Sequence, residues 1–176
     1  MKAKYIIFIL IMTLIACKTE YPNINQRILF EKHYTNWAWG FQNNGYLIDS
    51  LGSVRTFDLS KVTIKWNEPD KDGYISLAEM NKNFSHCDSI IYQINTDTLS
   101  YYVGKIWAAS KGKISEPVNQ MADAGCITYS AFIFDEKTNC YKKVLIKTWG
   151  DWSIDNDSPE AAEIYQWMMR IGKKYK

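Results

Sequence analysis

The chain of 176 residues carries 21 Lys and Arg against 19 Asp and Glu, which gives a formal net charge of +2 at pH 7. This near balance excludes the basic surface that nucleic-acid-binding proteins use, so no nucleic acid is expected among the partners. Beyond the N-terminus, no apolar run reaches the roughly 20 residues that a membrane-spanning helix needs. The length favours a single domain with a hydrophobic core of its own.

The N-terminus has the pattern of a bacterial export signal. Two lysines precede an apolar run at residues 5–15, broken only by Thr13, which is too short to span a bilayer but has the length of a signal-peptide core. The run ends in Leu14-Ile15-Ala16-Cys17, which resembles the lipobox of bacterial lipoproteins. The resemblance implies cleavage before Cys17, a diacylglycerol on its sulfur, and a fatty acyl chain such as palmitate on the freed amine.

This signal divides the chain into three expected parts. We expect a signal peptide at residues 1–16, a polar lipidated tether at 17–25 and a single globular domain at 26–176. Loss of the signal leaves 19 basic and 19 acidic residues, hence no net charge. The expected location is the cell envelope, on the periplasmic face or the cell surface, with the outer membrane favoured over the inner. The alternative is an ordinary secretory signal that happens to carry a cysteine.

The first element expected in the domain is a β-hairpin. The strand-like runs at residues 46–48 and 54–57 flank a turn in which Asp49 favours the start and Gly52 supplies a positive φ. Residues 59–66 remain open between two structures. Apolar residues recur there at helical spacing, whereas three consecutive β-branched residues favour a strand.

A short helix is expected at residues 76–84. It opens on Ser76 and Glu79, whose spacing is that of a capping box, in which each side chain satisfies a backbone amide at the helix start. Residues 88–95 contain three isoleucines and a tyrosine and predict a strand.

Asp97 or Thr98 can cap the next helix, and four apolar residues share one face of it: Leu99, Tyr102, Val103 and Ile106. Two strand-like runs at residues 127–134 and 141–149 are then joined by a polar turn, and they form the clearest hairpin in the chain.

The register of this hairpin determines whether Cys126 and Cys140 can form a disulfide. With residues 135–138 as a four-residue loop, Cys140 faces Ile133 and Cys126 faces Lys147. The two cysteines then lie seven pairs apart, or about 24 Å, whereas a disulfide tolerates a Cα separation of only about 4.4–6.8 Å. We therefore expect no bridge between Cys126 and Cys140.

The last element expected is a C-terminal helix. Asp157 as a cap, an early proline and Glu160 near the positive end of the helix dipole predict its start. Its buried stripe is formed by Ala161, Ile164, Trp167, Met168 and Ile171. The order of hairpins and helices lacks a regular βαβ alternation. It favours an α+β fold, an antiparallel sheet of hairpins covered by two or three helices.

Residues 68–79 resemble the calcium loop of an EF-hand, with Gly73 at the position where the loop turns sharply. The residues that would supply oxygen ligands are Glu68, Asp70, Asp72, Tyr74, Ser76 and Glu79. Glu68 departs from the aspartate usual at the first position, and no second loop pairs with this one. The alternative needs no metal, since an acidic turn followed by the capping box explains the same residues. Calcium is the one cofactor that the sequence suggests.

Other polar residues give weaker signals. Asp151, Asp155 and Asp157 lie near two tryptophans and form a second candidate cation or polar-ligand site. His33 and His86 are the only histidines, and no nucleophile elbow, phosphate loop or metalloprotease motif accompanies them, so no catalytic residue is assigned. Aromatic residues make up 15% of the chain, and they serve either a core or an exposed platform for sugar rings.

The leading interpretation is a membrane-anchored binding or structural module without enzymatic activity. A calcium-binding lipoprotein is the first alternative. The second is an extracytoplasmic enzyme acting on glycan or peptide, which no motif supports. The body of the chain resembles small uncharacterised lipoproteins of Gram-negative bacteria through Gly-Tyr-Ile-Ser and Thr-Trp-Gly-Asp-Trp, and this resemblance brings no activity. The expected partner is the membrane, through the lipid on Cys17, and a protein or glycan partner is left open.

Overall fold

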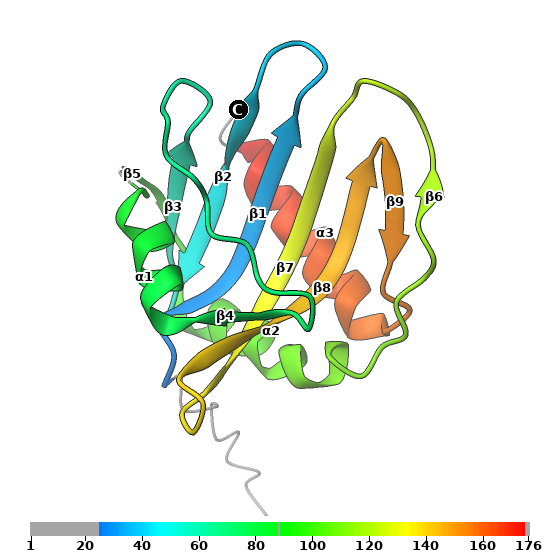
Figure 1. Ribbon diagram of the computed structural model, residues 1–176. Coiled ribbons are helices and arrows are strands. Elements are labelled where there is room, and N and C mark those ends of the chain that lie inside the picture. Colours follow the sequence, from blue (N-terminus) through cyan, green and yellow to red (C-terminus); the bar gives the residue numbers. More distant parts are fainter. Residues whose placement is uncertain (1–24, 88, 175–176) are drawn as a thin grey trace, which may run out of the picture.

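The computed structural model describes residues 25–87 and 89–174 (Figure 1). The signal peptide, the lipobox with Cys17 and nearly all of the tether lie outside the described residues. Within them, a nine-stranded antiparallel sheet and three helices confirm the expected α+β fold. The C-terminal helix packs on the sheet, as expected.

The sheet has the strand order β5-β3-β2-β1-β7-β8-β9-β6, and β4 pairs with β8 off this path. The strands are β1 (Ile28–Asn36), β2 (Gln42–Asp49), β3 (Ser53–Asp58), β4 (Tyr74–Ser76), β5 (Ser89–Gln93), β6 (Val118–Asn119), β7 (Cys126–Asp135), β8 (Cys140–Gly150) and β9 (Trp152–Asp155). The helices are α1 (Leu77–Ser85), α2 (Thr96–Ala109) and α3 (Pro159–Lys174).

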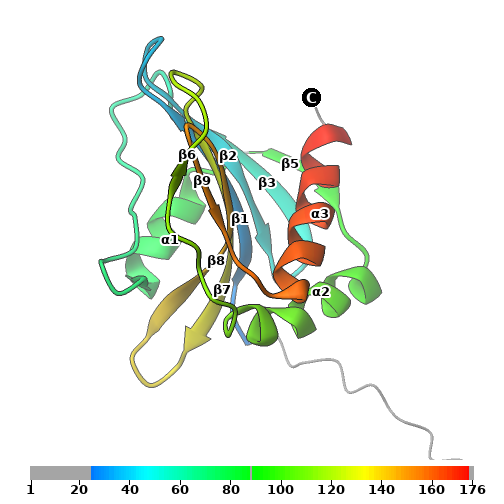
Figure 2. The same cartoon turned by 90° about the vertical axis from the view of Figure 1, so that its right-hand side faces the viewer.

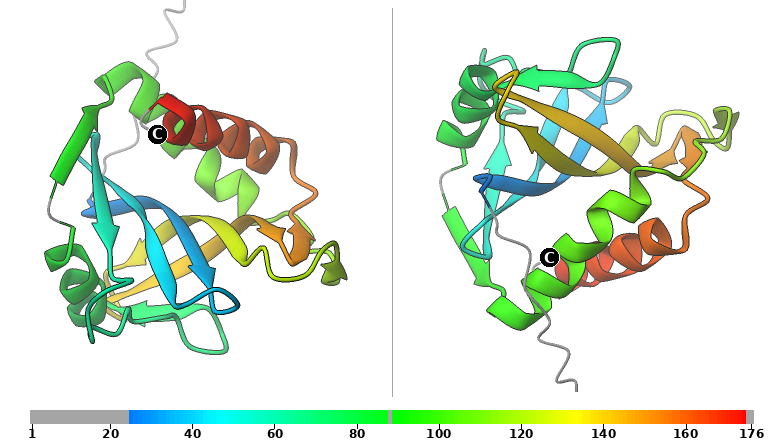
Figure 3. Two further views of the ribbon diagram at one scale, coloured as in Figure 1. Left: turned by 90° about the horizontal axis from the view of Figure 1, so that it is seen from above. Right: turned by 90° about the horizontal axis from the view of Figure 1, so that it is seen from below.

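The two faces of the sheet carry separate hydrophobic cores. Helices α2 and α3 cover one face, here called the helix face, while α1 and the coil at residues 59–73 lie over the other, the outer face (Figures 2 and 3). Phe30 packs against Trp167 of α3 on the helix face. Alternation alone would place Ile28 on the same face. The β-bulge between Ile28 and Phe30 turns Ile28 to the other side, where it joins Met80 of α1 in the outer core.

The hairpin formed by β2 and β3 confirms the expected turn. Asp49 accepts hydrogen bonds at Oδ1 from the amides of Leu51 and Ser53, at 3.0 and 2.9 Å, and Gly52 has a φ of +81°. The open segment at residues 59–66 is neither helix nor strand. It runs as a coil that buries its two ends, Leu59 and Trp66, and leaves residues 61–65 exposed.

Helix α1 begins at the expected capping box of Ser76 and Glu79. The caps of the other helices differ from those expected. Asn95, whose backbone is extended, caps α2 by accepting the amide hydrogen of Thr98 at 2.8 Å, in place of Asp97 or Thr98. In α3, the Ser158 hydroxyl accepts from the first turn. Asp157 does not cap this helix, because its carboxylate accepts a hydrogen bond from the amide of Lys113 at 2.7 Å.

The β7–β8 hairpin is confirmed, but its expected register is wrong by two positions at the turn. Cys140 faces Asp135, and Cys126 faces Gly150. Asn139 takes a positive φ of 55°, so the four-residue loop begins one residue later than expected and β7 is longer. Cys126 and Cys140 are free thiols, nine positions apart along β7, or about 31 Å.

Candidate functional site

The segment that resembles a calcium loop is held by hydrogen bonds of its own. Asp70 accepts at Oδ1 from the amides of Asp72 and Tyr74, at 2.9 and 2.8 Å. The amide of Asp70 donates to the Tyr74 carbonyl at 2.7 Å, which occupies an oxygen that an EF-hand would turn toward the ion. Residues 70–74 therefore form a closed acidic turn.

The remaining residues of this segment point elsewhere. The Ser76 and Glu79 side chains bond each other and the first amides of α1, and these bonds lower the pKa of Glu79. Glu68 faces His33 and Lys143. In the part of the chain that the structure describes, no group of three or more His, Cys, Asp or Glu side chains could hold a metal ion. The structure does not bring the six residues together, and calcium binding stays a prediction.

His33 belongs to a buried polar network on the outer face. Its Nε2 atom lies 2.7 Å from Oδ1 of Asn43 and its Nδ1 atom 3.3 Å from Oε1 of Glu68, and the residue is only 5% exposed. Glu31 of the same strand accepts the indole hydrogen of Trp66 at 3.0 Å. Lys143 lies 3.8 Å from both carboxylates. Because both ring nitrogens of His33 are engaged, the network fastens the coil to the sheet.

Burial and the neighbouring polar groups shift the pKa values of His33 and Glu68 in opposite directions. Burial by itself lowers the pKa of His33, but the hydrogen bond to Glu68 and the charges of Glu31 and Glu68 outweigh it and raise the pKa above 6.5. Burial raises the pKa of Glu68, and His33 and Lys143 outweigh that effect, so its pKa falls below 4.5.

The other candidate residues do not converge either. The Cys87 thiol is buried and donates to the carbonyl of Asn83, so the residue is a packed thiol. The three aspartates near the tryptophans separate: Asp155 pairs with Lys147, and Asp157 holds the amide of Lys113. Asp151 accepts from backbone amides in the loop before β7. The three aspartates therefore do not form the candidate cation site, and of the three only Asp151 lines a hollow among the described residues.

The outer face is only partly covered. The coil and α1 lie over β1, β2 and β3, and two adjoining hollows of about 420 and 680 Å³ lie on the uncovered part. Both are lined by Cys126 of β7, and we call the two adjoining hollows together the outer groove. Its first end has Thr35 and Trp37 and its second end Trp152.

The floor of the outer groove follows from the register of four strands. Thr35 of β1 faces Cys126 of β7, and Thr128, two residues further along, faces Thr148 of β8. Thr148 in turn faces Ile154 of β9. Paired residues lie on the same face of a sheet, so these threonine hydroxyls share the floor with the Cys126 thiol and the Ile154 side chain. The hydroxyls of Thr128 and Thr148 lie 3.4 Å apart.

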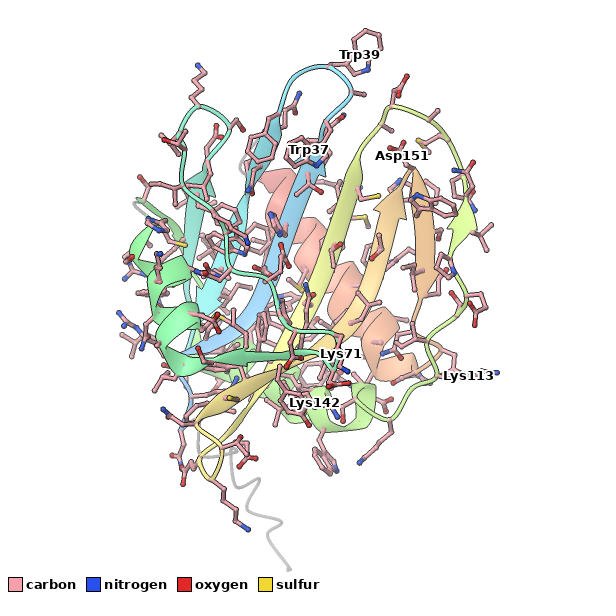
Figure 4. All side chains as sticks on the ribbon, viewed as in Figure 1. Trp37, Trp39, Lys71, Lys113, Lys142 and Asp151 are labelled. Carbon is pink, nitrogen blue, oxygen red and sulfur yellow. The ribbon has the colours of Figure 1, made fainter. Side chains whose placement is uncertain are left out.

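Tryptophans stand at both ends of this floor. Trp37 is 77% exposed and packs against Phe41, with ring centroids 4.4 Å apart. Trp152 is 47% exposed. The two ends are three strand spacings apart, or about 14 Å. Trp39, also 77% exposed, lies at the tip of the β1–β2 loop, as Figure 4 shows.

The rim of the outer groove is built by Asp151. In Figure 4 it lies across the end of β7 from Trp37. Its carboxylate accepts from the amides of Ala124 and Gly125, at 2.8 and 3.2 Å. The neighbouring Gly150 has a φ of +141°, and a Cβ atom there would meet the Gly125 carbonyl oxygen at 1.9 Å. The loop before β7 is therefore held close against the β8–β9 turn.

Part of this site could be predicted from the sequence. The abundance of aromatic residues predicts either a core or an exposed platform, and Trp66 and Trp167 serve the core while Trp37 and Trp152 are exposed. No sequence pattern predicts the role of Thr35, Thr128 and Thr148, because only the pairing of distant strands brings them together. A comparison of the chain with protein-family models, with curated proteins and with solved structures finds no match.

Proposed function

We propose that the protein is a membrane-anchored binding module of the bacterial cell envelope, and that its outer groove binds an oligosaccharide. The observation that carries the proposal is the pair of exposed tryptophans, Trp37 and Trp152, at the two ends of an open floor lined with threonine hydroxyls. The anchor is the lipid expected on Cys17.

The chemistry of the outer groove suits sugar rings. A pyranose has apolar C–H faces that lie flat on an aromatic ring, and hydroxyls around its edge that need hydrogen-bond partners. Large, stiff aromatic side chains supply contact area at little entropic cost. The hydroxyls of Thr35, Thr128 and Thr148 both donate and accept. Among the described residues no Lys or Arg lines either hollow, which disfavours an anionic ligand.

The position of the outer groove suits an anchored protein. Strand β1 begins at Ile28, just after the expected tether, and ends at Asn36, next to Trp37. Its nine residues span about 30 Å. A lipid on Cys17 would hold the start of β1 near the membrane, and the Trp37 end would then face away from it (Figure 1). Among the described residues no helix is both long and apolar enough to cross a bilayer.

Titration with defined oligosaccharides tests the proposal. The probes are chitotriose, cellotriose and maltotriose, added to the mature chain carrying Cys17→Ala so that no detergent is needed, with binding followed by calorimetry. We expect at least one probe to bind, and Trp37→Ala and Trp152→Ala each to weaken binding about tenfold, which is about 1.4 kcal/mol.

The matched control is Trp107→Ala on α2. Trp107 is 64% exposed and lies under the Lys111 ammonium, 4.0 Å from its ring centre, outside both hollows of the groove. It should leave binding unchanged. If no probe binds, or if the groove variants bind as well as the control, the proposed function is wrong.

A further inference from the structure

A second cavity, separate from the outer groove, lies on the helix face. It has a volume of about 330 Å³ and opens between β5, α2 and α3. Figure 3 shows β5 at the sheet edge beside the two helices. Its walls are apolar and aromatic: Tyr92, Ile94, Tyr102, Trp167 and Ile171.

These walls belong to the helix-face core or pack against it. The rings of Tyr102 and Trp167 are stacked, with centroids 4.1 Å apart and planes 8° apart. Trp167 also packs edge-on against Phe30 at 5.1 Å. Ile94 and Ile171 are buried members of the helix-face core. An apolar cavity of about 150 Å³ is already large enough to bind benzene, so this one accommodates an apolar group about twice that size.

The mouth of the cavity is polar and carries one basic side chain. Asn95 and Thr98 line it where α2 begins, and the partial positive charge of this helix N-terminus is offset in part by Asp97 in the first turn. Arg170 of α3 lines it from the other side. Its Nε–H donates to the Gln166 carbonyl at 3.2 Å, which leaves the terminal amino groups of the guanidinium for another partner. Within residues 25–87 and 89–174, the ion pairs of the structure do not include Arg170.

From the apolar walls, the volume and the cationic rim together, we propose that this cavity binds a medium-chain free fatty acid. The alkyl chain lies against Ile94, Tyr102 and Trp167, and the carboxylate lies at the mouth beside Arg170. Guanidinium and carboxylate groups match in a planar, two-bond geometry, which gives the mouth its preference for an acid over an alcohol. This site is independent of the oligosaccharide proposal, because the two share no residue.

The test compares decanoate with 1-decanol. Both are titrated into the mature chain carrying Cys17→Ala, below the concentration at which decanoate forms micelles, with binding followed by calorimetry and tryptophan fluorescence. We expect one decanoate per chain. Arg170→Gln should weaken decanoate binding about tenfold and leave decanol binding unchanged. The matched control is Lys173→Gln, an exposed basic residue of α3 outside the cavity, which should change neither.

A second variant keeps the test independent of charge. Thr98→Phe places a large ring in the mouth at a half-exposed position, so the fold should tolerate it. It should abolish binding of both decanoate and decanol while circular dichroism stays unchanged. The proposal is overturned if decanoate does not bind the folded wild-type chain, if Lys173→Gln weakens binding as much as Arg170→Gln, or if Thr98→Phe binds normally.

Discussion

The Nδ1 atom of His33 lies 3.3 Å from Oε1 of Glu68, and this contact joins strand β1 to the coil that crosses the outer face. Beside it, the Trp66 indole donates to Glu31 at 3.0 Å, and Lys143 lies between the two carboxylates. These contacts hold the coil on the sheet.

The first prediction concerns pH. The pKa of His33 is raised above 6.5, so its contribution to stability is fully present below pH 6.5 and is lost as the pH rises through the raised value. The pKa of Glu68 is lowered below 4.5, so its contribution is present above pH 4.5 and is lost as the pH falls through the lowered value. The pair therefore stabilises the fold most between pH 4.5 and 6.5.

Urea unfolding at a series of pH values measures this dependence. His33→Gln should flatten the part of the profile above pH 6.5, because glutamine keeps hydrogen-bonding capacity but does not titrate. A histidine on a solvent-exposed surface would give no such dependence. A wild-type profile that rises from pH 6.5 to 8, or a His33→Gln profile identical to it, would show that the network does not act as described.

The second prediction concerns the start of α1. Ser76→Ala should lower the free energy of unfolding by about 1 kcal/mol, because the cap oxygen that accepts from the Glu79 amide is lost. Glu79→Ala should also destabilise the fold, with or without calcium, because the Ser76 amide loses its acceptor. Calorimetry with calcium or with a chelator checks this. A calcium-induced rise that Glu79→Ala removes would instead support the EF-hand hypothesis for residues 68–79.

A third prediction concerns the rim of the outer groove. Asp151→Ala removes the acceptor of two backbone amides and should cost about 2 kcal/mol. It should also weaken oligosaccharide binding, because the loop before β7 loses its support. Asp155→Ala is the control. Within the described part of the chain that exposed carboxylate pairs with Lys147 and Ser153, and its loss should cost less than about 1 kcal/mol. Equal losses in the two variants would contradict a structural role for Asp151.

The fourth prediction concerns the anchor, which lies outside the described residues. Cys17→Ala should abolish lipidation and move the protein from the membrane fraction to the soluble fraction. Two or three acyl chains hold a protein on a bilayer far more firmly than one, since each buried CH₂ contributes about 0.8 kcal/mol. Mass spectrometry of the mature wild-type protein should show the added acyl mass. If it shows none and the variant still sediments with membranes, the lipobox interpretation is wrong.

Sequence patterns predicted the elements that are stabilised locally. The buried stripe of α3, the capping box of α1 and the turn at Gly52 each depend on residues a few positions apart, and each is present. The cap of α2 lies two or three residues before the expected positions, and the cap of α3 lies one residue after the expected one. Several polar residues near each helix start could cap it. Only the backbone geometry determines that Asn95 and Ser158 do so.

Features that depend on distant pairing could not be predicted. The register of β7 and β8 differs from the expected one because Asn139 adopts a positive φ, which places the turn one residue later. Strands β4 and β6, of three and two residues, are too short to show alternation. The contact of His33 with Glu68 and the row of threonines on the groove floor require strand pairings that no local pattern encodes.

The most direct test of oligosaccharide binding in the outer groove is the set of indole N–H signals in a nitrogen–proton correlation spectrum. The chain has seven tryptophans, so seven signals report on seven sites. With a bound oligosaccharide, the signals of Trp37 and Trp152 should shift, while that of Trp107 and those of the buried Trp66 and Trp167 stay in place. Shifts confined to Trp107 or Trp167, or an unchanged spectrum with every probe, would contradict the account.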